Sequence, residues 1–145
     1  MKTIEELKNE WNVDCVIDEL KLQEVISSTP VIHAKYLDEL VQYKLRLAKL
    51  YNEQSEYKAL RTRYYRGELS KEELETHGWP QWQIKTIRGD IEPMILAEQQ
   101  YQVLLTRESY YKAAIFFLES VIQEIRSRSF HCKNLIEWHK FRAGA

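Results

Sequence analysis

Glycine and proline are scarce in this sequence of 145 residues, which contains four of the former and three of the latter. Both residue types interrupt regular structure, so their scarcity favours long helices over a strand-rich fold. No stretch approaches the roughly 18 consecutive apolar residues of a membrane-spanning helix, and residues 1–6 contain no apolar core of a signal peptide. We therefore expect a cytosolic, mainly all-α protein that forms a single domain over residues 1–145, with no membrane partner.

Cysteine is also scarce, and Cys15 and Cys132 are expected to be small buried hydrophobic residues rather than a disulfide. His131 and His139 lie near Cys132, but adjacent ligands without a convincing fourth partner make a metal site the weaker interpretation. The sequence has no glycine-rich loop of the kind that holds a nucleotide phosphate. It therefore predicts neither an enzyme nor a bound metal or cofactor.

Helical periodicity is what the sequence has in abundance. Thr29 and Pro30 are typical of a helix start, with Thr29 as the N-cap, and the helix is expected over residues 30–66. Apolar residues repeat there along a seam with heptad spacing, and a second apolar stripe runs beside it. The seam is Tyr36, Leu40, Tyr43, Leu47, Leu50, Gln54, Tyr57, Arg61 and Tyr64, and the second stripe is Leu37, Val41, Ala48 and Tyr51. Two apolar stripes need two neighbours.

A second long helix is expected over residues 93–128, with Asp90 as its cap and Pro93 near its first turn. Its seam is Leu104, Tyr111, Ile115, Leu118, Ile122 and Ile125. Because this seam also keeps heptad spacing, the two helices should pair as a long helical hairpin.

Shorter elements are expected around this hairpin. The connecting region, residues 67–92, should contain a short helix that begins at Ser70. Its Trp79 and Trp82 need a surface to pack against, on the hairpin or on another subunit. A further helix is expected over Thr3–Trp11, and another over the C-terminal segment.

Charge is distributed unevenly, although the net charge is only -1. Residues 58–66 hold four cations and no acid, and residues 126–145 hold five cations and one acid, while the rest of the chain is acidic. Such an asymmetry indicates local surfaces for a polyanion rather than a globally basic protein that coats DNA.

The basic stretch, residues 58–66, also contains the adjacent Tyr64 and Tyr65. Cations neutralise phosphates and aromatic rings stack on unpaired bases, so the combination favours single-stranded DNA. Tyr64 occupies the helix seam, which leaves Tyr65 as the expected base contact. The candidate DNA-binding residues are Lys58, Arg61, Arg63, Tyr65 and Arg66. The alternative is a solvated helix end whose cations complement the helix dipole and whose tyrosines pack on a neighbouring helix.

The C-terminal segment, residues 129–145, is amphipathic, with aromatic residues on one side and cations around them. An aromatic face of this extent must be buried, either on its own chain or on a neighbouring subunit. The candidate oligomerisation residues are Phe130, Leu135, Trp138 and Phe141.

Matches to a known family run in order along nearly the whole chain. They are Val16-Ile17-Asp18, Lys21-Leu22-Gln23, Lys35 with Tyr36-Leu37, Arg61 with Tyr64-Tyr65 and Gly67, and, most densely, Ser127-Arg128, Phe130, Lys133, Phe141 and Ala143-Gly144. On these residues the chain resembles the UvsY family of phage recombination mediator proteins. The region from Glu68 to about Tyr101 matches least well.

The resemblance implies a non-enzymatic helical protein that assembles into a ring of identical subunits, a hexamer or heptamer, in the cytoplasm of the infected bacterial host. It also implies a role in homologous recombination and repair. The protein would bind single-stranded DNA and load a RecA-like recombinase onto DNA coated by single-strand-binding protein. A coiled-coil adaptor that contacts an acidic protein instead of DNA is the alternative.

Two residue roles are carried over from the family. Its DNA contacts include a lysine and an arginine two positions apart. Arg61 falls on the arginine, but Ala59 falls on the lysine, so the role of that lysine passes to Lys58, Arg63 or another group. The family also attributes assembly to the C-terminal helix, which agrees with the need to bury the aromatic face there.

Overall fold

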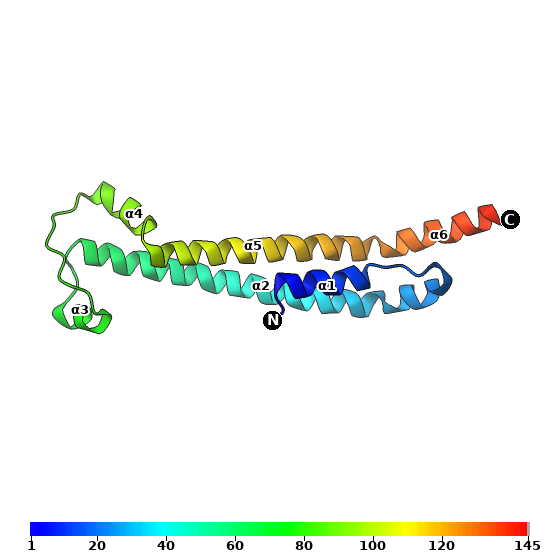
Figure 1. The fold of residues 1–145 in the computed structure, drawn as a ribbon, viewed down its shortest axis with the longest axis horizontal. Helices are drawn as coiled ribbons and strands as arrows, with labels where there is room; N and C mark the ends of the chain where they lie inside the picture. Colours follow the sequence, from blue (N-terminus) through cyan, green and yellow to red (C-terminus); the bar gives the residue numbers. More distant parts are fainter. Residues whose placement is uncertain (145) are drawn as a thin grey trace. The chain divides into compact units, whose positions relative to one another are not determined.

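The computed structural model describes residues 1–144 and is helical throughout its regular structure (Figure 1). The elements in order are α1 (Ile4–Asp14), a 3-10 turn η1 (Glu19–Lys21), α2 (Leu22–Tyr65), α3 (Lys71–His77), α4 (Arg88–Leu96), α5 (Gln99–Arg126) and α6 (Arg128–Arg142). No strand occurs over these residues, so the expected all-α class is confirmed. None of these helices is both long enough and apolar enough to cross a bilayer.

The chain divides into two compact units, and the first combines Met1–Leu45 with the chain from Tyr111 onward. Its core is formed by α1, the first part of α2 and the second part of α5. The heptad seams predicted for the two long helices supply most of this core. The buried members are Leu7, Tyr36, Leu40, Tyr43, Ala114, Leu118, Val121, Ile122 and Ile125. The seam pairing expected for a hairpin is therefore present in this unit.

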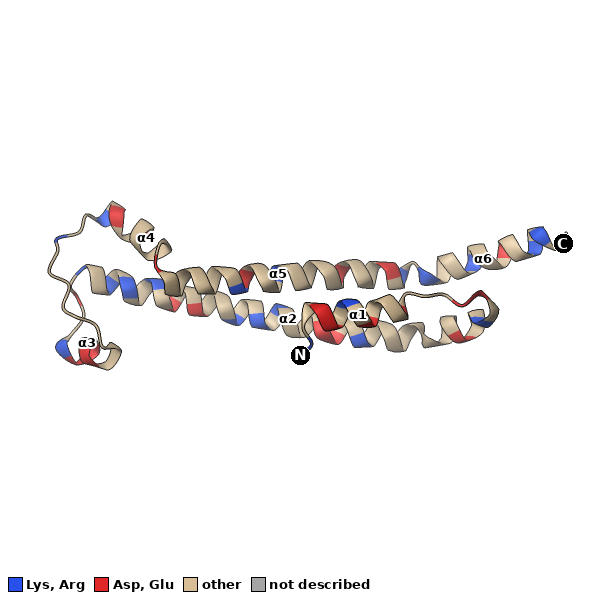
Figure 2. Cartoon of the chain, in the orientation of Figure 1, with Lys and Arg blue, Asp and Glu red and all other residues tan. Residues whose placement is uncertain are grey.

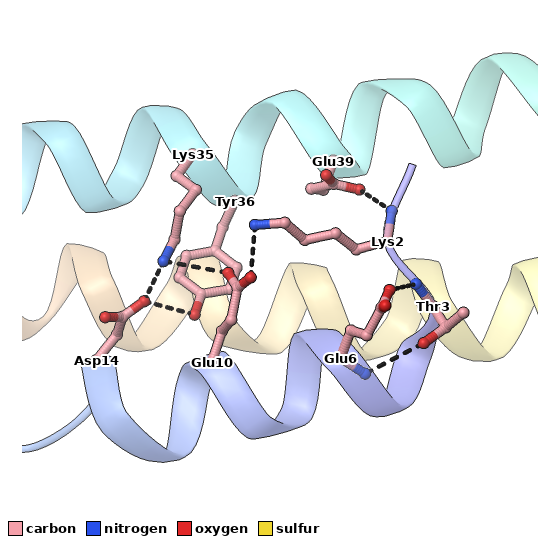
Figure 3. Close-up of polar contacts among 8 residues, drawn as sticks. All are labelled: Lys2, Thr3, Glu6, Glu10, Asp14, Lys35, Tyr36 and Glu39. Atoms are coloured by element: carbon pink, nitrogen blue, oxygen red, sulfur yellow. Dashed lines mark hydrogen bonds and ion pairs between the residues drawn. The ribbon is translucent and has the colours of Figure 1, made fainter.

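Polar contacts fix both ends of α1 (Figure 3). At its start, the Thr3 hydroxyl accepts a hydrogen bond from the Glu6 amide, and the Glu6 carboxylate accepts one from the Thr3 amide at 2.8 Å. At its end, Asp14 accepts hydrogen bonds from the Lys35 ammonium and, at 2.8 Å, from the Tyr36 hydroxyl of α2. Burial alone would raise the pKa of Asp14, but these donors outweigh burial and lower it.

The start of α2 differs from the sequence prediction. The helix begins at Leu22 rather than at residue 30, and Pro30 lies inside it. Thr29 is not an N-cap, because its hydroxyl donates to the Val25 carbonyl at 2.8 Å instead of accepting from an amide. Asp18 caps the preceding 3-10 turn, so the chain is already turning when it enters α2. A proline tolerated within a helix cannot by sequence alone be told from one that starts it.

The second unit, Arg46–Tyr110, contains the rest of α2, α3, α4 and the first part of α5. Its core consists of Tyr64, Tyr65, Ile91, Ile95 and Tyr101. α3 begins where expected, since the Ser70 hydroxyl accepts a hydrogen bond from the Glu73 amide at 3.1 Å. Trp79 and Trp82 are half-buried against this core, which gives both indoles the packing surface that the sequence required.

The second long helix, expected over residues 93–128, is divided in the structure. Pro93 lies inside the short α4, which ends at Leu96, and α5 begins only at Gln99. Asp90 is not a cap, because α4 starts after Ile87 and Asp90 lies within its first turn. The chain turns after Leu96, and Glu98, which lies in this turn, contacts side chains of α2. The sequence predicted one continuous helix here and no such contact.

The two apolar stripes of α2 have different surroundings. The seam residues are buried or half-buried, from Tyr36 to Tyr64. The second stripe is exposed along its length, at Leu37, Val41, Ala48 and Tyr51. Within the described residues, the protein thus supplies a neighbour for one stripe of α2 and leaves the other in solvent.

Candidate nucleic-acid interface

The basic stretch forms the last turns of α2 and ends at a glycine. Gly67 has a φ of 71°, in the left-handed region, and the Glu68 amide donates to the Arg63 carbonyl at 2.9 Å. Glycine adopts this conformation without steric cost and commonly ends helices in this way. Lys and Arg residues recur along these turns with no acidic residue among them (Figure 2), whereas the first turn of α3 carries Glu72 and Glu73.

Arg61 points into the second unit rather than into solvent. Only 14% of its side chain is exposed. Its guanidinium carbon lies 4.6 Å from the centre of the Tyr64 ring, 4.9 Å from that of Tyr65 and 4.5 Å from that of Trp79. Cation–π contacts of this kind are strengthened when water is excluded. The three rings therefore form a cage for this cation.

Glu98 completes the cage from the segment between α4 and α5. It accepts hydrogen bonds from three side chains of α2: the Tyr57 hydroxyl, the Arg61 Nε at 3.0 Å and the Tyr65 hydroxyl at 2.9 Å. Burial alone would lower the pKa of Arg61, but the hydrogen bond and the charge of Glu98 outweigh burial and raise it. The charge of Arg61 is thus balanced inside the protein.

Tyr65, the residue expected to stack on a base, is 8% exposed. Its ring packs edge-on against Trp82, with centroids 4.9 Å apart. Burial, and then the hydrogen bond to Glu98, raises the pKa of the Tyr65 hydroxyl. Base stacking needs an open ring face, so in this structure Tyr65 has the contacts of a packing residue. Tyr64 is buried, as its place in the seam predicted.

Lys58, Arg63 and Arg66 place their charges at the surface. Lys58 lies 3.7 Å from a carboxylate oxygen of Glu92, and Arg63 lies 3.1 Å from one of Glu73. Arg63 holds the pKa of Glu73 below its usual value. The Arg66 side chain is exposed and makes no ion pair with any other described residue. The structure therefore separates the predicted site residues into an exposed group and the enclosed pair Arg61 and Tyr65.

The predicted oligomerisation residues lie on α6, in the first unit. The start of α6 is anchored, since Arg128 is buried and donates to the backbone carbonyls of Asp14 and Val16. Beyond it, Phe130 is 62% exposed, Trp138 54% and Phe141 73%, and Leu135 is half-buried. The Trp138 and Phe141 rings stack at 5.7 Å. An aromatic face thus remains open on the single chain.

Sequence reasoning missed Glu98 as a site residue. It is one of 22 acidic residues, and nothing in its local sequence distinguishes it. The role of Trp79 was also missed, although the sequence indicated that both loop tryptophans must pack. In the described part of the chain, no group of three His, Cys, Asp or Glu side chains is arranged to hold a metal ion.

Comparisons with known proteins agree on one family. Residues 10–145 match the family described as recombination, repair and ssDNA binding protein UvsY. The recombination protein uvsY of Enterobacteria phage T4 is 22% identical over 141 residues, which cover 97% of this chain and 98% of that protein. Two crystal structures of the bacteriophage T4 recombination mediator protein UvsY share this fold. Lattice type II matches with a TM-score of 0.81 at 20% identity and covers 99% of each chain. Lattice type IV has the same TM-score and identity and covers 97% of this chain and 99% of that one.

Proposed function

Because the chain belongs to the UvsY family, we propose that it is a recombination mediator that binds single-stranded DNA through Lys58, Arg63 and Arg66 at the end of α2. The observation that carries this proposal is the grouping of exposed cations on a stretch of nine residues, 58–66, that contains no acid. Lys58 and Arg63 lie in the last turns of α2 and Arg66 directly follows its last residue, Tyr65, so the three cations form a short row along this end of the helix. Such a row suits the repeating phosphates of a single strand.

The acidic partners of these cations do not oppose this role. Glu92 and Glu73 contact Lys58 and Arg63 at exposed positions, where an ion pair contributes little to stability. A phosphate can therefore replace either carboxylate at low cost. Arg61 contributes indirectly, since its cage orders the helix end that carries the exposed cations.

Assembly and partner loading complete the proposed function. A ring of identical subunits would repeat the row of cations and make weak sites act together on one strand. In that arrangement the protein would load a RecA-like recombinase onto DNA coated by single-strand-binding protein. The proposed role requires no catalysis by the protein itself, and it takes place in the cytoplasm of the infected host.

The decisive experiment replaces both Arg63 and Arg66 by glutamine and measures binding to a fluorescent oligo(dT) at several salt concentrations. We expect weaker binding and a slope of log affinity against log salt that is shallower by about 1.4 per bound subunit, because two phosphate contacts are lost. The matched control replaces Lys8 and Lys21, two exposed cations of the first unit, by glutamine. If the wild-type protein shows no salt-dependent affinity for oligo(dT), the proposal is wrong and the adaptor alternative gains support.

A further inference from the structure

We propose that the segment from Trp82 to Thr86 forms, together with the end of α2, a pocket that holds one nucleotide of the bound single strand. This inference rests on the proposed function, because it adds a subsite to the same DNA-binding surface. It assigns a role to the connecting region, to which the family resemblance assigned none.

The pocket is a cavity of about 280 Å³ in the second unit. Its walls come from two segments that are distant in sequence. The lining residues are Tyr65, Arg66 and Gly67 from the end of α2, and Trp82, Gln83, Ile84, Lys85 and Thr86 from the connecting region. Ligand pockets start at roughly 300 Å³, so this volume suits a single base rather than a larger ligand.

The floor of the pocket is held in place by hydrogen bonds and ring contacts. The Trp82 Nε1 donates to the Thr86 hydroxyl at 3.0 Å, and the Thr86 hydroxyl donates to the Ile84 carbonyl at 3.3 Å. The Trp82 ring also packs on Tyr65. Together these contacts hold the Trp82 indole in one orientation within the loop from Trp82 to Thr86. The indole of Trp82 is therefore a fixed apolar wall in a pocket whose other lining is largely polar, and a fixed aromatic ring can contact a base without regard to sequence.

The side chains at the mouth of the pocket match a nucleotide in charge and polarity. Arg66 and Lys85 are exposed, and neither makes an ion pair with another described residue. Ile84 is 66% exposed, so its apolar side chain is accessible to a base. Gln83 adds an amide that can donate to or accept from a base edge.

The local charge supports the same ligand. Residues 79–89 contain Lys85 and Arg88 and no acid, as the basic stretch contains none. Two acid-free segments therefore meet at this pocket, within a chain whose net charge is -1. A polyanion with flat, partly apolar bases fits such a site, whereas an acidic peptide would leave the apolar wall unused.

The test compares Ile84→Ser and Lys85→Gln with the wild-type protein, using oligo(dT) and an oligonucleotide of equal length whose sugars carry no bases. Both positions are exposed, so the variants should fold, and circular dichroism checks this. Lys71→Gln, on α3 outside the pocket, is the charge-matched control. We expect Lys85→Gln to flatten the salt slope by about 0.7, the value for one phosphate contact with a single strand. We expect Ile84→Ser to weaken oligo(dT) binding about threefold to tenfold and to leave binding of the baseless oligonucleotide unchanged, because only bases contact the wall.

The outcomes separate this inference from the proposed function. If Arg63→Gln with Arg66→Gln weakens binding while Ile84→Ser and Lys85→Gln bind both oligonucleotides like the wild type, the pocket is not a nucleotide site and the surface on α2 stands. If Ile84→Ser weakens binding to both oligonucleotides equally, the base contact is wrong. If the wild-type protein binds neither oligonucleotide, the proposed function itself fails.

Discussion

The guanidinium carbon of Arg61 lies 4.5 Å from the centre of the Trp79 ring, so a cation of α2 is covered by a side chain from the loop after α3. The Trp79 ring also contacts Tyr64 at 5.2 Å and stacks on the ring of His77 at 4.5 Å with an interplanar angle of 21°. The contacts of Trp79 with Arg61 and Tyr64 join the basic stretch to the connecting region. They also give Arg61 a structural role that its position in a run of cations did not suggest.

The first prediction is that Arg61→Gln mainly destabilises the protein. The substitution leaves the half-buried Glu98 without its ionic partner and removes the cation from three rings. We expect a loss of roughly 2 to 3 kcal/mol in the free energy of unfolding, below the range for fully buried pairs because Arg61 retains some exposure. Urea unfolding followed by circular dichroism measures it. Arg63→Gln, whose ion pair is exposed, should change the stability by less than about 1 kcal/mol.

The second prediction concerns Glu98. Glu98→Gln keeps the shape of the side chain but removes the charge that faces Arg61, and it leaves an amide opposite two hydroxyls. We expect lower stability, with Arg61 becoming more reactive toward an arginine-modifying reagent such as phenylglyoxal. Mass spectrometry of the Arg61 peptide gives the readout. Unchanged protection of Arg61 would mean that the rings alone hold the guanidinium.

The third prediction concerns the hydroxyl group of Tyr65. Tyr65→Phe removes the hydroxyl that Arg61 and Glu98 bind but keeps the ring on Trp82. We expect it to lower stability by about 1 kcal/mol, the usual net value of a hydrogen bond, and to leave DNA affinity nearly unchanged. Thermal unfolding and oligo(dT) titration are both needed. A stable Tyr65→Phe variant with weakened DNA binding would mean that the Tyr65 hydroxyl itself contacts the DNA.

The fourth prediction is a pH dependence at the end of α1. The pKa of Asp14 is lowered in the folded protein, so its ionised form stabilises the fold above the unfolded pKa, and this stabilisation is lost as the pH falls through the folded pKa. Asp14→Asn should therefore cost about 1 to 2 kcal/mol near neutral pH, where the bonds to Lys35 and Tyr36 are charge-assisted. Towards pH 3 the variant and the wild type should converge. A constant difference from pH 7 to pH 3 would contradict the assignment.

The fifth prediction tests α6. Removal of the chain from Phe130 onward should convert the assembly into small species that remain helical, and Trp138→Ala should do so in part. Aromatic residues at interface hot spots often contribute about 2 kcal/mol or more. Analytical ultracentrifugation measures the size of both variants. Full-sized assemblies without the tail would indicate that the exposed stripe of α2 holds the subunits together.

Periodicity was the part of the fold that the sequence predicted well. The seam from Tyr36 to Tyr64 is buried or half-buried as expected, because heptad spacing follows directly from helix geometry. The residues at which helices begin and end were predicted less well. Pro30 is compatible both with a first turn and with a helix interior, and only the neighbouring hydroxyl contacts decide between them.

The candidate site shows which contacts a local sequence pattern cannot predict. Of Lys58, Arg61, Arg63 and Arg66, only Arg61 falls on the heptad seam, and it is the one that points inward. The seam predicts the face of α2 on which Arg61 lies but not its partners. The orientation of Arg61 depends on Glu98 and Trp79, which are 37 and 18 positions further along the chain. A local pattern contains no information about contacts at that separation. For α6 the sequence predicted an aromatic face but left open whether its own chain covers that face, and in the structure Phe130, Trp138 and Phe141 are exposed.

The exposed side chains of Phe130, Trp138 and Phe141 make protein concentration a variable in any measurement on this chain. If subunits bury this face against one another, unfolding also separates them, and mass action then raises the midpoint temperature as the sample is concentrated. Sufficient dilution would then expose the face before the helices melt. In that case titrations of dilute protein would report the single chain, and those of concentrated protein the assembly.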